Sequence, residues 1–352
     1  MSFVMGRDTD LEDGPVASIG MYRALDGSEG APVHVDLDRP HSMMIVGKRG
    51  YGKSYTLGVL AESLSEPDGI APVIIDPMGV YTTMASGRGS ESIAVEVVSE
   101  PTVVSTALEP RSWCALLDLS PESAAGALVW QAASNAATVD EMNEHIDATD
   151  APGADKRSAR NHIQLASTWG VFAPDGLTAA DLCGPEVTVI DVSGLDSAPM
   201  NAVVRAIAES LYHARVTETV RRLPWLLIDE AHTFFDGVAE PALETILTRG
   251  RAPGVSLVLA TQRPSAVSEV GISQSDLIIS HRLTSHADLE ALRKVQPTYM
   301  DSSLDQRMPT EPGEVIVVDD STETVHAVQI RERKTPHGGS SPRASTIRDL
   351  QR

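Results

Sequence analysis

Lysine, cysteine and large aromatic side chains are scarce in this chain of 352 residues. Five of its 28 basic residues are lysines, aromatic residues make up 4% of the sequence, and Cys114 and Cys183 are its only cysteines. Their spacing excludes the usual metal motifs, and we interpret both as buried thiols of a cytosolic protein. No run approaches the ~20 apolar residues of a membrane helix, and the acidic N-terminus does not suit a signal peptide. These absences predict a soluble, cytoplasmic protein with no membrane partner.

Acidic residues dominate the charge. The chain has 49 Asp and Glu residues against 28 Lys and Arg, which gives a net charge of −21. Together with the scarcity of lysine, this composition resembles that of halophilic archaeal proteins, whose carboxylate-rich surfaces keep them soluble in concentrated salt. An acidic interaction surface is the alternative interpretation. The net charge does not exclude nucleic acid as a partner, because a basic strip can line a pore and salt screens repulsion.

Short apolar runs alternate with helical patterns along most of the chain. The run "HSMMIVG" (41–47) predicts a strand, residues 53–67 a helix and "PVIIDPMGVY" (72–81) a second buried strand. Strand, helix and strand form the βαβ unit of a parallel sheet. Further strands are predicted at "EVTVIDVSGL", "LPWLLIDEAH", "VSLVLATQRP", "DLIISHRLT" and "GEVIVVDD". The fold class is therefore α/β with a mainly parallel central sheet.

Three regions differ from this regular core. Residues 15–38 alternate around the turn-rich "DGSEG" and predict a β-hairpin, so residues 1–40 are interpreted as a short N-terminal β-element. The core covers 41–335, with a mainly α-helical insertion at about 85–185. The polar residues 336–352 are predicted to form a flexible tail.

The octet "GKRGYGKS" matches the phosphate-binding pattern G-x-x-x-x-G-K-[ST]. Gly47 and Gly52 allow a tight turn, whose backbone N–H groups meet phosphates at the start of a helix. Lys53 would neutralise the β- and γ-phosphates, and Ser54 would bind Mg²⁺. A glycine turn with a solvated lysine is the structural alternative, but the strand before and the helix after the octet disfavour it. The predicted nucleotide-binding residues are Gly47, Lys48, Arg49, Gly50, Tyr51, Gly52, Lys53, Ser54 and Tyr55.

Two further strand ends carry candidate catalytic residues. Asp229 follows the apolar run "WLLI" and would hold Mg²⁺, while Glu230 would polarise the attacking water. An Asp-Glu pair after a strand can also be surface charge, but its pairing with the phosphate loop favours hydrolysis of ATP. Gln262 in "LATQRP" is predicted to lie near the γ-phosphate and to sense hydrolysis.

Six segments in order resemble the HerA/FtsK superfamily, and in particular its HerA-like branch. They are "GKRGYGKSYTLGVLAE", "IIDPMGVY", "VTVIDVSGL", "LLIDEAH", "RGRAPGVSLVLATQRPS" and "PGEVIVV", and they span about residues 40–330. The resemblance implies a RecA-like P-loop ATPase of the ASCE class that assembles into a hexameric ring and pumps double-stranded DNA. It also implies Lys53 and Ser54 at the phosphates, Asp229 at Mg²⁺, Glu230 at the water and Gln262 as the polar sensor.

The sequence departs from this family in two places. HerA-like proteins usually read "DPHGEY" on the second strand, whereas here Asp76 is kept but Val80 replaces the glutamate. Residues 1–40 are too short for the N-terminal β-barrel through which HerA binds its nuclease partner. A nuclease or other DNA-processing partner therefore cannot be identified, and a stand-alone, viral or plasmid-encoded member is favoured.

Arginines are candidates for two roles. Ring ATPases place an arginine of a neighbouring subunit on the γ-phosphate. We predict Arg39 in this role in trans and Arg282 in cis, with Arg249 and Arg251 as further candidates. For DNA, the densest basic clusters are "RGRAPG" and "KRSAR" (156–160), which suit contacts to phosphates irrespective of sequence. A solvated helix face is the favoured interpretation of "KRSAR".

A DNA-translocating ATPase is the leading hypothesis. A viral genome-packaging or conjugative DNA pump is an alternative within the same superfamily. A nucleotide-gated scaffold without DNA translocation is an alternative from another class, supported by Val80 and the missing barrel but opposed by the complete hydrolytic set. A protein-remodelling ATPase would respond to unfolded protein instead of DNA.

Overall fold

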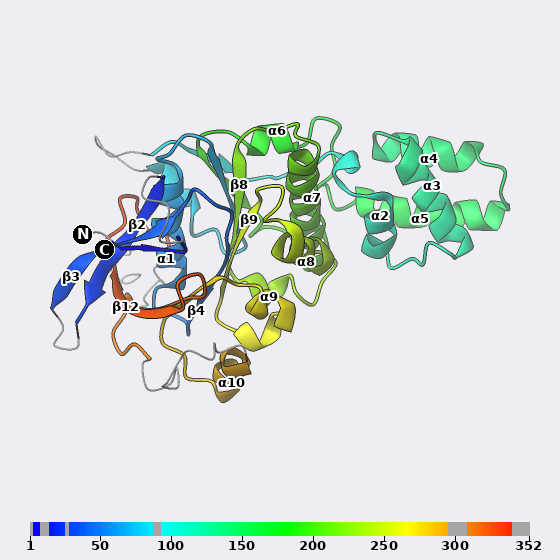
Figure 1. The fold of residues 1–352 in the computed structure, drawn as a ribbon. Coiled ribbons are helices and arrows are strands. Elements are labelled where there is room, and N and C mark those ends of the chain that lie inside the picture. Colours follow the sequence, from blue (N-terminus) through cyan, green and yellow to red (C-terminus); the bar gives the residue numbers. More distant parts are fainter. Residues whose placement is uncertain (1–2, 8–13, 25–27, 87–92, 295–307, 340–352) are drawn as a thin grey trace, which may run out of the picture.

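In the computed structural model of the protein, residues 3–7, 14–24, 28–86, 93–294 and 308–339 are described. Within these ranges the strands form one sheet of 12, in the order β1-β3-β2-β12-β11-β10-β4-β9-β8-β5-β7-β6 (Figure 1). No helix in the same ranges is long and apolar enough to cross a bilayer.

One half of the sheet is parallel. Seven neighbouring strands run in the same direction: β6 (Val95–Val98), β7 (Val187–Asp191), β5 (Ile70–Asp76), β8 (Leu223–Ile228), β9 (Ser256–Thr261), β4 (Ser42–Val46) and β10 (Leu277–Ser280). Strand β9 lies between β4, which leads into the phosphate loop, and β8, which ends before Asp229. The carboxyl ends of these three strands therefore meet at one edge of the sheet. This architecture confirms the predicted α/β fold with a mainly parallel sheet.

The other half of the sheet is mostly antiparallel. Strands β11 (Glu314–Asp319), β12 (Thr324–Ile330), β2 (Val16–Arg23) and β3 (Glu29–Asp36) follow β10, and β1 (Phe3–Met5) pairs in parallel with β3. The predicted hairpin at 15–38 is present as β2 and β3. Through the pairing of β2 with β12, the described part of residues 1–40 belongs to the same sheet as the core and is not a separate element.

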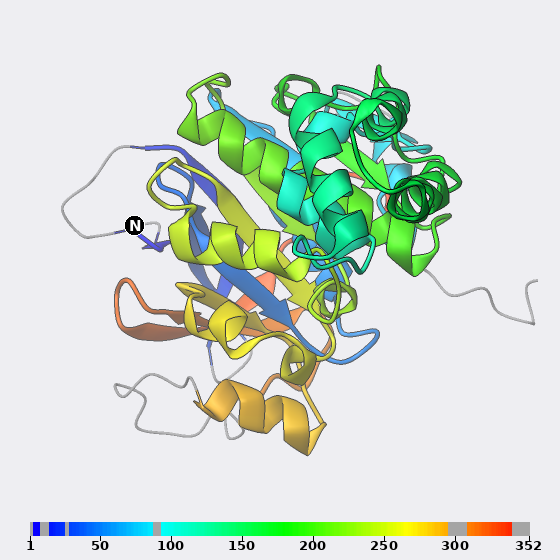
Figure 2. The same ribbon diagram turned by 90° about the vertical axis from the view of Figure 1, so that its right-hand side faces the viewer.

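Helices cover both faces of the parallel half because alternate strand residues point to opposite sides. Met43 and Ile45 of β4 pack in one apolar cluster with helix α1 (Lys53–Leu64). Met44 and Val46 belong to the other cluster, together with α7 (Ser197–Val216) and α8 (Glu240–Arg249). Figure 2 looks onto this second face. The short helices α6 (Ala179–Leu182), α9 (Glu269–Ser273) and α10 (His286–Lys294) complete the core.

Four helices form an arm that projects from the core (Figure 1). They are α2 (Pro110–Leu116), α3 (Ala124–Asn135), α4 (Val139–Ala148) and α5 (Gly153–Ser167), and we call residues 110–167 the helical arm. The arm is shorter than the helical insertion expected at 85–185, since Val95–Val98 pair with β7 as an edge strand. Four residues carry too little pattern to identify a strand from the sequence.

Hydrogen bonds to Glu209 of α7 hold the start of the helical arm and the residue before it. The carboxylate of Glu209 accepts hydrogen bonds from the backbone N–H of Glu109 at 2.9 Å and from Ser112 Oγ at 2.6 Å. Within the arm, Lys156 donates to the backbone oxygen of Asp147, and Arg160 pairs with the Asp147 carboxylate. The cluster "KRSAR" thus ties α5 to α4, in keeping with its interpretation as a helix face.

A buried ionic cluster lies at the edge of the sheet opposite the phosphate loop. His41 Nδ1 lies 2.9 Å from Asp276 Oδ2, and His41 Nε2 lies 3.8 Å from Asp36 Oδ2. Arg7 and Arg251 pair with the same two carboxylates. Burial alone would lower the pKa of His41, but the hydrogen bond with Asp276 and the charges of Asp276 and Asp36 raise it to about 9. His41 is therefore a buried cation at neutral pH.

We expect this cation to make stability depend on alkaline pH. The folded-state pKa of His41 lies above its unfolded value, so its contribution is complete below about pH 6.5 and is lost as the pH rises through about 9. The shift corresponds to about 3 kcal/mol. Urea unfolding at pH 6.5, 8 and 9.5 measures the effect, and His41→Gln should remove most of it. Equal alkaline losses in both proteins would contradict this role.

Candidate active site

The phosphate loop connects β4 to α1 through glycines that no other residue can replace without strain. Gly52, at the N-cap of α1, has φ 108°, a left-handed conformation that suits glycine. A Cβ on Gly47 would lie 2.5 Å from Cβ of His281. No side chain caps the helix start, which leaves the N–H groups of the first turn free to bind an anion.

The loop rests on the residues that follow β10. His281 is buried, and its Nε2 lies 2.9 Å from Thr56 Oγ1. Burial and the nearby Lys53 lower the pKa of His281 to about 3, so the ring is neutral beneath the phosphate site. Lys48 N–H donates to the backbone oxygen of Arg282 at 2.8 Å. The backbone of Arg282 thus supports the loop, while its side chain reaches Thr310 O at 3.4 Å.

Lys53 and Ser54 form the first turn of α1. Lys53 is 5% exposed, and its burial lowers its pKa, although the carboxylates of Glu230 and Asp229 act in the opposite direction. The lysine is thus held in a site with little water, opposite two acids. A desolvated ammonium group in such a place interacts strongly with an incoming phosphate.

The two acids after β8 differ in environment. Asp229 is 1% exposed, and its Oδ1 accepts the backbone N–H of Glu230 at 2.9 Å. Glu230 has φ 45° and ψ 43°, a strained left-handed conformation of the kind found at functional sites. Burial and the charge of Asp229 raise the pKa of Glu230, whereas the charges of Lys53 and Arg49 and the nearby amide of Gln262 lower it. A carboxylate with a raised pKa suits a general base.

Tyr81 is a site residue that the sequence reasoning missed. It is fully buried, and its hydroxyl, which has one proton to donate, lies 3.0 Å from Asp229 Oδ2 and 3.1 Å from Ser54 O. Asp76 holds Tyr81 in place by accepting the backbone N–H groups of Met78, Val80 and Tyr81. The role of Asp76 is thus to build this turn. The final tyrosine of "DPMGVY" is the only signal that pointed to it.

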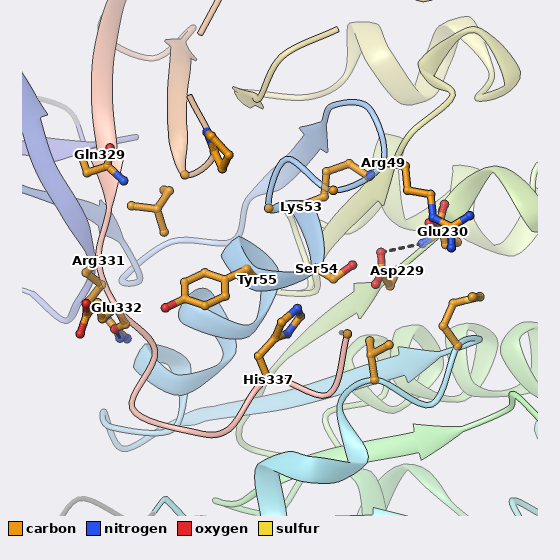
Figure 3. Close-up of a pocket in the computed structure, with 18 residues that line it drawn as sticks. Arg49, Lys53, Ser54, Tyr55, Asp229, Glu230, Gln329, Arg331, Glu332 and His337 are labelled. Carbon is orange, nitrogen blue, oxygen red and sulfur yellow. Dashed lines mark hydrogen bonds between the residues drawn. The ribbon is translucent and has the colours of Figure 1, made fainter. Parts of the chain in front are cut away.

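The loop and the acids line a cavity of about 560 Å³ (Figure 3). Val80 also lines it, so a hydrocarbon side chain stands where the family pattern has glutamate. The far side of the cavity comes from the C-terminal part of the chain. Its lining residues there are Pro312, Gly313, Gln329, Ile330, Arg331, Glu332, His337 and Gly339.

Residues 331–339, which we call the C-terminal strap, pack along α1. The buried carboxylate of Glu62 accepts hydrogen bonds from Thr335 Oγ1 at 2.6 Å, from the N–H groups of Thr335 and Lys334, and from Arg331 Nη1 at 2.8 Å. Arg333 covers Gly58, where an added Cβ would lie 2.6 Å from its guanidinium. Residues 336–352 were predicted to form a flexible tail, but residues 336–339 pack beside the cavity. Residues 340–352 lie outside the described residues.

The predicted residues divide into three groups. Gly52, Lys53, Ser54, Asp229 and Glu230 line the cavity, and Arg49, Gly50 and Tyr55 join them. Gln262 lies close to Glu230, whereas Gly47, Lys48 and Tyr51 of the phosphate loop do not line the cavity and Arg282 lies beside the loop. Arg39 is exposed before β4, and Arg249, the last residue of α8, and Arg251 are exposed at the opposite edge of the sheet.

Solved structures share this architecture across nearly the whole chain. VirB4 of Thermoanaerobacter pseudethanolicus matches with TM-score 0.64 and 20% identity, over 92% of this chain and 98% of that chain. The bacterial conjugative coupling protein TrwB matches with TM-score 0.59 and 14% identity, over 94% and 91%. TrwB in complex with a non-hydrolysable GTP analogue matches with TM-score 0.52 and 15% identity, over 86% and 88%. No curated protein sequence matches the chain.

A family assignment follows from the sequence itself. Residues 18–211, more than half of the chain, match the family described as the central domain of the helicase HerA. The matched range contains the phosphate loop, the Asp76 turn and the helical arm. This chain belongs to the HerA central-domain family and has the RecA-like P-loop fold.

Proposed function

We propose that the protein is an ATP-hydrolysing motor of the HerA/FtsK type that translocates double-stranded DNA. One observation carries the proposal: Lys53, Ser54, Asp229 and Glu230 line one cavity, with Gln262 close to Glu230. A phosphate-binding lysine, a metal-binding pair and a general base are together the requirements for hydrolysis of a triphosphate. A protein that only binds nucleotide has no need of the base.

The oxygen atoms beside the phosphate loop suit Mg²⁺. Ser54 would provide a hydroxyl and Asp229 a carboxylate, and Mg²⁺ prefers few protein oxygens together with phosphate oxygens. The hydrogen bond from Tyr81 to Asp229 Oδ2 fixes the orientation of that carboxylate. When bound, the metal would neutralise charge on the phosphates. Glu230 would accept a proton from the attacking water.

Assembly into a ring, with a hexamer as the expected form, would complete the site. Arg39 precedes β4 at the edge opposite the phosphate loop, and the five residues of β4 span about 17 Å. Its side chain therefore suits the γ-phosphate of a neighbouring subunit and not its own. Arg282 lies beside its own loop and is proposed to act in cis. The acidic composition suits a salt-rich cytoplasm, as in halophilic archaea.

Val80 favours a second candidate, a nucleotide-gated scaffold. A hydrocarbon side chain at this position removes one carboxylate from the cavity wall.

A viral packaging or conjugative pump would use the same site as a translocase and differs only in its biological setting.

ATP hydrolysis with and without linear double-stranded DNA, over a series of KCl concentrations up to the molar range, tests the proposal. The series is required because contacts to DNA phosphates weaken steeply with salt. We expect duplex DNA to raise turnover at the lower salt concentrations. Slow turnover that ignores DNA at every concentration would favour the scaffold.

A further inference from the structure

The cavity has two chemically distinct ends (Figure 3). Asp229 and Glu230 lie at one end, Lys53 and Ser54 lie in the middle, and Gln329 and Glu332 lie at the other end beyond Tyr55. If the proposed function is right, the γ-phosphate faces Glu230. The nucleoside must then extend toward Tyr55 and the strands β11 and β12.

We propose that this far end is a purine subsite that prefers adenine, in which Gln329 reads the edge of the base. The subsite rests on the proposed function but adds a property to it, because the hydrolytic residues do not touch the base. It has an apolar wall at Pro312 and Ile330, an aromatic ring at Tyr55 and one oriented amide at Gln329.

The orientation of the Gln329 amide follows from its neighbour. Arg23 Nη1 donates to Gln329 Oε1 at 3.2 Å, and Arg23 Nε is itself held by Glu314 at 2.8 Å. A guanidinium has only donors, so the oxygen of the amide must face Arg23. The NH₂ group consequently faces the other side, toward the cavity that Gln329 lines.

Gly313 leaves room for this amide. It has φ 83°, and a Cβ at this position would lie 2.8 Å from Gln329 Nε2. A side chain on residue 313 would therefore displace the NH₂ group. The glycine both allows the turn before β11 and keeps the donor accessible.

A donor at this wall distinguishes adenine from guanine. N1 of adenine accepts a hydrogen bond, whereas N1 of guanine carries a hydrogen and donates one. When N1 of the base meets the amide, adenine accepts the hydrogen bond directly, whereas guanine must shift so that its neighbouring acceptor O6 meets the N–H groups. A shifted base or an unsatisfied polar pair in a partly buried site is costly, so the amide creates a preference for adenine.

The subsite is rigidly connected to the phosphate-binding helix. The backbone N–H of Arg333 donates to Tyr55 Oη at 2.7 Å, and the His337 ring meets the Tyr55 ring edge-on with centroids 5.6 Å apart. Glu62 holds the same strap from the next turns of α1. The base wall and the phosphate loop therefore keep a fixed relative position, as a nucleotide of fixed length requires.

Equilibrium binding of three probes tests the subsite: AMPPNP, GMPPNP and inorganic tripolyphosphate. Gln329→Leu should weaken AMPPNP binding about tenfold, which is the effect of one lost hydrogen bond at a desolvated site. It should change GMPPNP much less and leave tripolyphosphate unchanged, since that probe needs only the phosphate loop. Gln131→Leu, the same substitution at an exposed position of the helical arm, should change none of them.

A second variant provides a gain of function. Gln329→Glu keeps the partner of Arg23 but presents only acceptors to the cavity, so the ratio of GMPPNP to AMPPNP affinity should rise above that of the natural protein. The subsite would be overturned if both variants bound tripolyphosphate and kept the natural circular dichroism spectrum, yet showed the natural ratio of GMPPNP to AMPPNP affinity. Failure of the natural protein to bind any of the three probes would instead contradict the proposed function.

Discussion

Replacing Glu230 by glutamine should lower ATP turnover about 100- to 1,000-fold while nucleotide binding stays within a few-fold of the natural value. The amide has the size of the carboxylate but cannot accept a proton from water. Because burial and Asp229 raise the pKa of Glu230, the natural activity should also fall with acidification at a pH above the ordinary value for glutamate. This acidic limb should be absent from the residual activity of the variant.

Single-turnover hydrolysis and equilibrium binding of AMPPNP separate these two effects. Glu100→Gln serves as the matched control, since Glu100 is exposed in the loop after β6. We expect this control to hydrolyse ATP at the natural rate. If Glu230→Gln lowered the rate of ATP hydrolysis less than about fivefold, another group would be the general base and Glu230 would act only through its charge.

Replacing Glu62 by alanine should lower the free energy of unfolding by about 3–5 kcal/mol. The substitution leaves the guanidinium of Arg333, 2% exposed, without the carboxylate that neutralises it, and it removes the acceptor of Thr335. Burial alone would raise the pKa of Glu62, but hydrogen bonds from Thr335, Lys334 and Arg331 lower it. The stabilisation should therefore be present above about pH 4.5 and be lost as the pH falls below it.

Urea unfolding of Glu62→Ala and Glu66→Ala at pH 7 provides the comparison. Glu66 pairs with Lys334 of the same strap at 2.6 Å, but both side chains are more than one third exposed. Exposed pairs contribute about 0–1 kcal/mol, so Glu66→Ala should be nearly neutral. Similar losses in the two variants would show that the strap is held by its backbone and not by the buried charge.

The parts of the site that could be predicted are those encoded by neighbouring residues. The phosphate loop is one octet between a strand and a helix, and Asp229 and Glu230 end an apolar run, so their chemistry is readable locally. Gln262 lies near Glu230 because β9 is next to β8, and its predicted role at the γ-phosphate stays a prediction. Parallel strands bring such ends together without further information.

The parts that could not be predicted depend on long-range pairing. Thr335 and Glu62 are 273 residues apart, and neither lies in a recognisable pattern. The described N-terminal strands join the core sheet through the pairing of β2 with β12, which a reading of separate segments cannot reveal. Tyr81 was not predicted because a buried aromatic residue after a strand usually indicates packing. Its hydroxyl is recognised as part of the site only through its hydrogen bond to Asp229, which follows the neighbouring strand β8.

The contact between Gly58 and Arg333 has a consequence for how this helix can vary. Glycine in a helix interior costs about 1 kcal/mol relative to alanine, so a survey of intrinsic preferences would select Gly58 for improvement. Here the guanidinium of Arg333 occupies the space that a side chain on residue 58 would need. The residue that most favours an isolated helix would therefore force the guanidinium of Arg333 to move from its place against α1. At position 58, a higher helix preference comes at the cost of this contact.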